Sequence, residues 1–347
     1  MTILTHNAFE DKLSLVLVPL LASAGLRILK FVQYDKCSRA LLDALLSIPG
    51  IALPSRPEDA EKILLRTNGV YAAFPKSAVL YDSAPSDSTS VKIDRFKKSC
   101  LFTLYAAEWD GIACDIRIGD YSSAIPIKVA QEVAMNLKKH CDAACMGASF
   151  FITNMIQTLG YALGPRLELK EALFVLEARG PLDFTKLAIE LGADLLMQAG
   201  KFTDRTRAKS FLKKQLQTGA ALNKFKDIIL MMNGDLGPIA DLPLPALSQK
   251  CVRIASPGKG FVQRIAMDRL LNLKHRLCAG HKRTGILLLK KIGDSTSVND
   301  TLAEAFVPSS WDDQIILNEF RDIFSISHSP PEFQPLVVEK IKGSFRF

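Results

Sequence analysis

The chain has 347 residues, 48% of them hydrophobic and 23% charged, which suits one large or two ordinary globular domains. No apolar run reaches about 18 residues without a charge or a helix breaker, so a transmembrane helix is not expected. The net charge of +8 is uneven, because residues 201–291 contain 19 Lys and Arg against 5 Asp and no Glu. Such an excess attracts phosphate groups, although solvated helix faces would give the same composition.

Cysteine usage bears on the cellular compartment. The seven cysteines show no paired spacing, which favours a reducing, intracellular environment. His140, Cys141 and Cys145 come closest to a metal cluster, but no second ligand pair accompanies them, so neither a metal nor a cofactor is expected. The N-terminal residues include Glu10 and Asp11 and lack the pattern of a signal or transit peptide. A mature N-terminus from which such a peptide has been removed would also lack this pattern.

The first third of the chain predicts mostly helices. They are expected over residues 13–26, 38–46, 55–68 and 92–108, with a short strand at 70–74 and a loop at 82–90. Pro19 should kink or interrupt the first helix. Ser55 and Glu58 have the spacing of a capping box, and Asn68-Gly69 is a typical end for the helix that follows them.

The middle of the chain alternates strands and helices. Strands are predicted over residues 111–118 and 148–152 with a helix over 130–140 between them, and further helices over 167–177, 184–198 and 205–216. Asp183 is placed to cap the helix that begins at the next residue. A strand–helix–strand order predicts a sheet covered by helices, which is the α/β class.

The chain beyond residue 245 predicts a β-rich module. Asn233-Gly234 and Pro243-Leu244-Pro245 mark its boundary, and Pro330-Pro331 precedes a short tail. Short strands are expected over residues 251–255, 260–265, 286–289 and 301–306. The segment Ser256-Pro257-Gly258-Lys259-Gly260 is similar to a phosphate loop, but it lacks the Gly-Lys-Ser/Thr ending and a following helix, so we expect a turn.

One stretch, from Thr153 to Asp183, is specific enough to indicate a family. It reads T-N-M-I-Q-T-L-G-Y-A-L-G-P-R-L-E-L-K-E-A-L-F-V-L-E-A-R-G-P-L-D. It resembles the Thr-Asp-Met and Leu-Gly-x-x-x-Gly-x-x-Leu-Glu-Val-x-Glu-Ala segments of the pyrimidine-nucleoside (thymidine) phosphorylases. Matches at Ser47-Ile48-Pro49-Gly50, at residues 110–119 and at residues 290–303 extend the resemblance over most of the chain.

The resemblance implies the family's fold: an α/β domain with a mixed sheet flanked by helices, a helical lobe and a β-rich C-terminal module. We assign residues 1–75 and 108–245 to the α/β domain, 76–107 to what remains of the helical lobe, and 246–347 to the C-terminal module with its tail. The family has a helical segment ahead of its phosphate loop, which supplies much of the dimer contact. Because this chain starts at that loop, we expect a truncated member without the family-type homodimer.

The family's reaction is phosphorolysis, in which phosphate attacks the anomeric carbon of a pyrimidine nucleoside and the base leaves. It requires positive charge and hydroxyl groups around the phosphate. In the aligned phosphate loop, the family's lysine and histidine fall on Ile3 and Leu4, and Glu10 replaces a glycine. Only Thr5 and Ser14 keep hydroxyl groups there. The resemblance therefore implies a degenerate phosphate site.

The base pocket and a second glycine-rich segment have changed as well. The family's base-contacting arginine, serine and lysine align with Ala84, Ser99 and Thr103. Tyr81 is kept, and Arg39-Ala40 stands where the second glycine-rich segment has its diglycine. One of the three base contacts thus survives.

These losses favour a catalytically inactive protein that serves as a structural or interaction subunit, with no catalytic residue. Two alternatives stay open. An active pyrimidine-nucleoside phosphorylase would have to rely on His6, Thr5, Ser14 and Ser99. A nucleoside-binding regulatory protein would keep Tyr81 and Ser99 as pocket residues without chemistry.

The basic region suggests protein partners within an RNA-rich assembly, such as a mitochondrial ribosome, and favours the mitochondrion over the cytoplasm. Aromatic residues are not interleaved with these charges, so contact with the RNA backbone is expected rather than base stacking. The candidate anion or RNA contacts are Arg205, Arg207, Lys209, Lys213, Lys214, Lys274, Arg276, Lys282 and Arg283. We expect the first five to lie near the last four.

Overall fold

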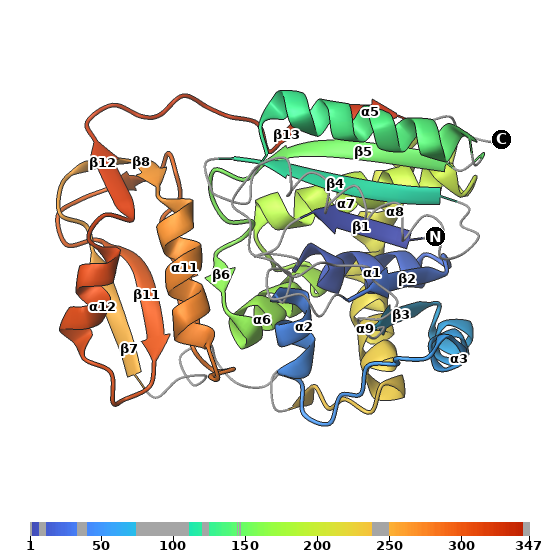
Figure 1. Cartoon of the computed structure of the whole chain (residues 1–347), viewed down its shortest axis with the longest axis horizontal. Coiled ribbons are helices and arrows are strands. Elements are labelled where there is room, and N and C mark those ends of the chain that lie inside the picture. The colour runs from blue at the N-terminus through green and yellow to red at the C-terminus, as the bar shows by residue number, and fades with distance from the viewer. Residues whose placement is uncertain are drawn as a thin grey trace.

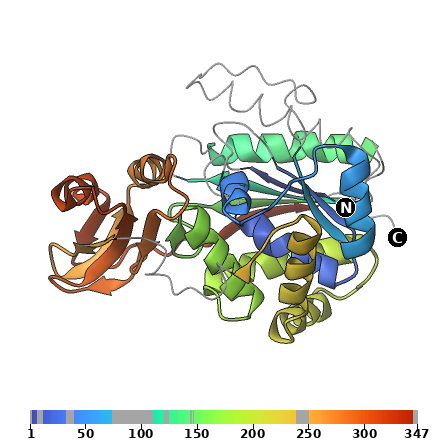
Figure 2. The same ribbon diagram turned by 90° about the horizontal axis from the view of Figure 1, so that it is seen from below.

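The computed structural model describes residues 2–6, 12–32, 40–73, 111–119, 125–143, 145, 147–237 and 250–342. Two units lie side by side (Figures 1 and 2): an α/β unit and a smaller unit near the C-terminus, here called the C-terminal module. The predicted domain boundaries at 75, 107 and 245 all lie outside the described residues, as do the predicted loop at 82–90 and helix at 92–108.

The α/β unit is built on a six-stranded sheet with the order β13-β5-β4-β1-β2-β3. Its strands are β1 (Thr2–His6), β2 (Ile28–Phe31), β3 (Gly69–Ala72), β4 (Gly111–Ile118), β5 (Gly147–Asn154) and β13 (Val337–Lys342). The first five are parallel, and β13 is antiparallel to β5. The expected α/β class with a mixed sheet is therefore confirmed.

Helices cover both faces of this sheet (Figure 2). Helix α5 (Ile127–Ala143) packs on β4 and β5 through an apolar cluster that includes Ile112, Ile116 and Phe150. The opposite face carries α1 (Leu13–Ser23) and α7 (Leu182–Gln198), and three further helices pack against these two: α6 (Pro165–Leu176), α8 (Arg205–Gln217) and α9 (Ala220–Met231). Helix α2 (Ala40–Leu46) packs on α6, and α3 (Pro57–Thr67) packs on β3 and α9.

Helix α1 continues through Pro19, so the expected interruption is wrong. Proline removes the amide that would donate to the carbonyl of Leu15. Here the hydroxyl of buried Tyr71 donates to the carbonyl oxygens of Ser14 and Leu15, at 3.1 and 3.3 Å. Tertiary packing thus satisfies the carbonyl that proline leaves open, and α1 remains a helix.

Two predicted caps are also wrong. Helix α3 is capped by Arg56 without a side-chain hydrogen bond, so Ser55 does not form the expected capping box. Its predicted end is confirmed, because Asn68 adopts the left-handed conformation with a φ of 60°. Helix α7 begins at Leu182 and has Pro181 as its N-cap, which places Asp183 inside the first turn.

The C-terminal module contains all four predicted strands: β7 (Lys250–Ala255), β8 (Gly260–Ile265), β9 (Gly285–Leu288) and β11 (Thr301–Val307). They form two small sheets, β10-β8-β12 and β6-β9-β11-β7, with β6 (Ala162–Leu163), β10 (Ser295–Thr296) and β12 (Phe324–Ser327). Helices α11 (Met267–Cys278) and α12 (Asp313–Phe320) were not predicted. Strand β6 belongs to the stretch that precedes α6, so it joins the two units.

The predicted tail beyond Pro330-Pro331 returns to the α/β unit and forms β13. Lys340 of β13 forms an ion pair with Asp194 of α7, which also pairs with Arg205 of α8. The Lys340 ammonium lies 5.2 Å from the ring centroid of Phe151. The chain end is thereby anchored to both the sheet and its helical layer. Among the described residues, no helix is long and apolar enough to cross a membrane.

Candidate functional site

The strand order places the candidate site at the carboxyl end of β1. From β1 the chain proceeds to β2 and β3 on one side, and then to β4 and β5 on the other side. The connections on either side of β1 therefore diverge, and ligands of open α/β sheets commonly bind at the carboxyl ends of such strands. The segment that resembles the phosphate loop begins within β1.

The sequence-predicted site residues fall in three places. Ile3, Leu4 and Thr5 lie within β1, opposite Ala113, Cys114 and Asp115 of β4. Ser14 lies in the first turn of α1 and is fully buried, at 0% exposure. The base-pocket positions Tyr81, Ala84, Ser99 and Thr103 lie outside the described residues.

A buried ion pair ties the start of α1 to helix α6. The Lys12 ammonium lies 2.8 Å from a carboxylate oxygen of Glu171 and donates to the carbonyl oxygen of Ala162 at 2.7 Å. The other carboxylate oxygen of Glu171 accepts the backbone amides of Tyr161 and Ala162, at 2.6 and 3.1 Å. The Lys12 and Glu171 side chains are only 1% and 6% exposed. Removing either partner of a buried ion pair would destabilise the fold, because it leaves the other charge uncompensated away from water.

The turn that follows β5 wraps closely around the Glu171 carboxylate. Gly160 has a φ of +64°, and a Cβ atom there would lie 2.4 Å from a Glu171 oxygen. Only glycine combines this backbone conformation with that approach. The first glycine of the family-like Leu-Gly-x-x-x-Gly motif therefore has a structural reason in this chain.

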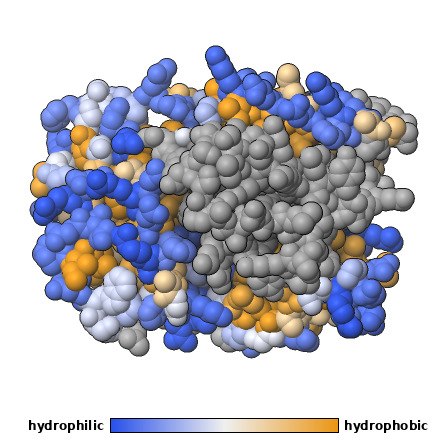
Figure 3. Space-filling view, viewed as in Figure 1, coloured by the Kyte–Doolittle hydropathy of each residue, from blue (hydrophilic) through white to orange (hydrophobic). Residues whose placement is uncertain are grey.

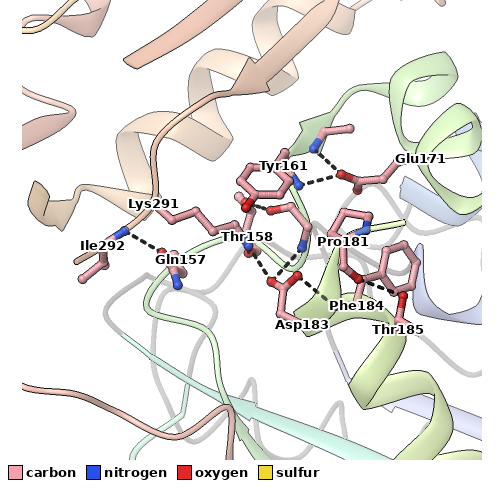
Figure 4. A network of polar contacts seen from close by, with 12 residues as sticks. Gln157, Thr158, Tyr161, Glu171, Pro181, Asp183, Phe184, Thr185, Lys291 and Ile292 are labelled. Atoms are coloured by element: carbon pink, nitrogen blue, oxygen red, sulfur yellow. Dashed lines mark hydrogen bonds and ion pairs between the residues drawn. The ribbon is translucent and has the colours of Figure 1, made fainter. Parts of the chain in front are cut away.

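A second ion pair joins the α/β unit to the C-terminal module (Figure 4). Lys291 donates to Asp183 at 2.5 Å and to the carbonyl oxygen of Thr158 at 3.1 Å, and its ammonium lies 4.7 Å from the Tyr161 ring centroid. Asp183 also accepts the backbone amides of Gly160 and Phe184. Asp183 therefore connects the two units, which replaces the capping role expected for it at the start of α7.

The environment of Asp183 favours its ionised form. Burial raises the pKa of this carboxyl group, but the charge and hydrogen bond of Lys291, together with the amides of Gly160 and Phe184, outweigh burial. The pKa consequently lies below its ordinary value of 3.8. The Asp183 carboxylate is thus ionised at neutral pH.

A third ion pair lies within strand β4, and the sequence analysis did not single it out. The guanidinium of Arg117 donates to Asp115 at 2.7 Å, and Thr153 of β5 donates to the other oxygen of Asp115 at 2.6 Å. Asp115 and Arg117 are 0% and 1% exposed. The sequence did carry a sign of this ion pair: opposite charges occupy alternate positions of an otherwise apolar strand, and alternate residues share one face of a sheet.

Three described cations near the strand ends are therefore matched by carboxylates. Lys12 pairs with Glu171, Arg117 with Asp115, and Lys291 with Asp183. A phosphate dianion that paired with any of these three cations would have to displace its carboxylate. Within the described residues, the arrangement suits a rigid junction better than an anion cradle.

The chain is 25% identical to the pyrimidine-nucleoside phosphorylase of Geobacillus stearothermophilus over 345 residues, covering 95% of this chain and 79% of that enzyme. It is 27% identical to the Bacillus subtilis enzyme of the same name, over 90% of this chain and 76% of that one. Over most of its length the chain is therefore similar to pyrimidine-nucleoside phosphorylases. No family model matches it.

A solved structure of anthranilate phosphoribosyltransferase from Thermus thermophilus is also similar, with 12% identity and a TM-score of 0.47, covering 67% of this chain and 77% of that one. The stretch that resembles the phosphorylases, residues 153–183, supplies Glu171, Gly160 and Asp183. These residues build the junction between the two units rather than a set of unpaired ligands.

The structure does not bring the nine basic candidates together. Helix α8 lies on the helical layer of the α/β unit, whereas α11 lies in the C-terminal module (Figures 1 and 2). Ion pairs with acidic side chains engage Arg205, Lys209, Lys274 and Arg276. Lys282 donates to the carbonyl oxygen of Leu46, and Arg283 is exposed beside it. Arg207, Lys213 and Lys214 are exposed on α8, with no ion pair among the described residues.

Proposed function

We propose that this protein is a catalytically inactive member of the phosphorylase family that serves as a structural or interaction subunit. The observation that carries the proposal is the matched charge at the strand ends. Each of Lys12, Arg117 and Lys291 already has a carboxylate partner. Phosphorolysis needs positive charge that is free to meet phosphate and the departing base.

The residues at the aligned phosphate positions support the same proposal. Ile3 and Leu4 have apolar side chains where the family has a lysine and a histidine, and Glu10 adds negative charge. Loss of a charged contact to a reacting group commonly lowers the rate by about 10²–10³-fold. Several such losses at one site would leave little turnover.

A phosphorolysis assay tests this proposal. We expect no release of uracil or thymine when uridine or thymidine is incubated with phosphate and a high concentration of the protein. The pyrimidine-nucleoside phosphorylase of Geobacillus stearothermophilus is the positive control under identical conditions. Base release that depends on phosphate and scales with protein concentration would overturn the proposal.

An active phosphorylase is the second candidate, and the similarity to phosphorylases is the observation that favours it. The relatives at 25% and 27% identity carry the name pyrimidine-nucleoside phosphorylase over most of this chain. If the assay detects base release, Lys291→Met should abolish it, because Lys291 brings a positive charge from the C-terminal module to the junction of the two units. A nucleoside-binding regulatory role would instead give thermal stabilisation by uridine without base release.

We further propose that the exposed face of α8 is the contact for an RNA-rich assembly, as in a mitochondrial ribosome. Arg207, Lys213 and Lys214 are the exposed cations that support this proposal. Replacing all three with glutamate should abolish binding to a double-stranded RNA probe and remove its salt dependence. Arg253→Glu together with Arg269→Glu, at exposed positions of the C-terminal module, is the control. Equal RNA binding by both variants would contradict an α8 contact.

A further inference from the structure

The C-terminal module contains a polar pocket away from the strand-end site. It has a volume of about 570 Å³ and lies where β8, β10 and the end of β12 meet. Its lining residues are Lys259, Gly260, Phe261, Lys290, Ser295, Thr296, Ser297, Asp300 and His328. Small-molecule sites commonly have volumes of roughly 300–1,000 Å³. The pocket is thus large enough for a sugar phosphate or a mononucleotide.

The phosphate-loop-like segment of the sequence forms one wall of this pocket. Hydrogen bonds hold the turn in place, from the Ser256 amide to the carbonyl of Asp300 at 2.8 Å and from the Asn299 amide to the carbonyl of Ser256 at 3.0 Å. A Cβ atom on Gly260 would lie 2.3 Å from the carbonyl oxygen of Ser327, so this close contact with β12 requires glycine. These contacts hold the turn in position beside the pocket, and Lys259 of this turn lines the pocket.

The charges around the pocket favour an anion. Asp300 is the one carboxylate in the lining; it accepts the Ser297 amide at 2.9 Å and lies 3.9 Å from the Lys290 ammonium. Lys259 and His328 are exposed and form no ion pair among the described residues. Hydroxyl groups of Ser295, Thr296 and Ser297 add donors of the kind that phosphate oxygens accept. Hydrophilic side chains dominate the visible face of this module (Figure 3).

We propose that this pocket binds a small phosphate monoester. Lys259 and His328 would contact the phosphate, and the partly buried Phe261 offers an apolar surface for the remainder of the ligand. Lys290 lines the pocket, while the next residue, Lys291, reaches Asp183 at the junction of the two units. The residue that lines the pocket is thus the sequence neighbour of the residue that joins the two units.

Calorimetric titration tests the proposal with inorganic phosphate, ribose 5-phosphate and uridine 5′-monophosphate as probes. We expect saturable binding of a monoester, tighter than inorganic phosphate, and at least about tenfold weaker binding in Lys259→Ala and His328→Ala, since each removes a charge-assisted contact. Lys226→Ala, at an exposed position of α9, is the matched control and should bind like the unmodified protein. Thermal melting shows whether each variant is folded.

Three results would overturn the proposal. They are no saturable binding of any monoester, equal affinity of the monoesters and inorganic phosphate, and unchanged affinity in folded Lys259→Ala and His328→Ala. The last result would place any bound phosphate elsewhere, including the strand-end site. Excess uridine separates these two sites, because it should compete for a nucleoside site at the strand ends and leave ligand in this pocket undisturbed.

Discussion

Replacement of Glu171 with alanine is expected to lower the free energy of unfolding by about 3–5 kcal/mol, because it removes the carboxylate that faces a buried ammonium group. Lys12 is 1% exposed and lies 2.8 Å from Glu171, which also accepts two backbone amides. Removing the carboxylate leaves all three donors short of an acceptor. Urea denaturation followed by circular dichroism measures the change.

Glu177 provides the matched control at the end of the same helix. Its ion pair with Arg179 is largely in solvent, so Glu177→Ala should cost no more than about 1 kcal/mol. A double-mutant cycle with Lys12→Met should show that the two buried substitutions together cost less than the sum of their separate effects. If Glu171→Ala and Glu177→Ala cost the same, the buried pair does not hold α1 on α6.

The variant Asp183→Asn is expected to lower stability at neutral pH by about 1–3 kcal/mol, since it removes the charge that pairs with Lys291. It should also flatten the acid dependence of stability. The folded-state pKa of Asp183 lies below the ordinary value of 3.8, so its contribution is complete above that pH. The contribution is then lost as pH falls through the lower folded-state pKa. Thermal melting between pH 2 and 7 measures this difference.

Asp322→Asn is the control for this experiment. Asp322 pairs with Arg269 at 2.8 Å, but both side chains are more than half exposed. We expect less than about 1 kcal/mol of effect and an unchanged acid profile. An Asp183→Asn protein with the stability and acid profile of the unmodified protein would show that Lys291 does not hold the two units together through this carboxylate.

Much of the secondary structure was accessible from local pattern. The strands at 111–118 and 260–265 match β4 and β8, and α8 matches the helix predicted from residue 205. Helix α11 was missed because its charged residues were taken as part of a basic region, although its apolar residues recur at helical spacing. Strand β13 was missed because a short segment after two prolines becomes a strand only when β5 is there to pair with it.

Some features of the candidate site could likewise be predicted from the sequence, whereas others required the tertiary structure. Residue identity alone led to the prediction that Ile3 and Leu4 stand where the phosphorylases have a lysine and a histidine. No local pattern could show that Lys12 meets Glu171, 159 residues away, or that Lys291 meets Asp183, 108 residues away. Such pairs are decided by which helices and turns pack together.

The sequence by itself determined the resemblance to the phosphorylases and the α/β class, and it predicted the changed phosphate positions, since motif spacing and side-chain chemistry can be read along the chain. The tertiary structure alone decided that the cations at the strand ends are already neutralised and that the basic residues of α8 and α11 lie apart. Charge balance depends on distance and burial, because an ion pair acts over a few ångströms and is strongest away from water. Sequence composition counts the charges of residues 201–291 but carries no information on which of them are paired.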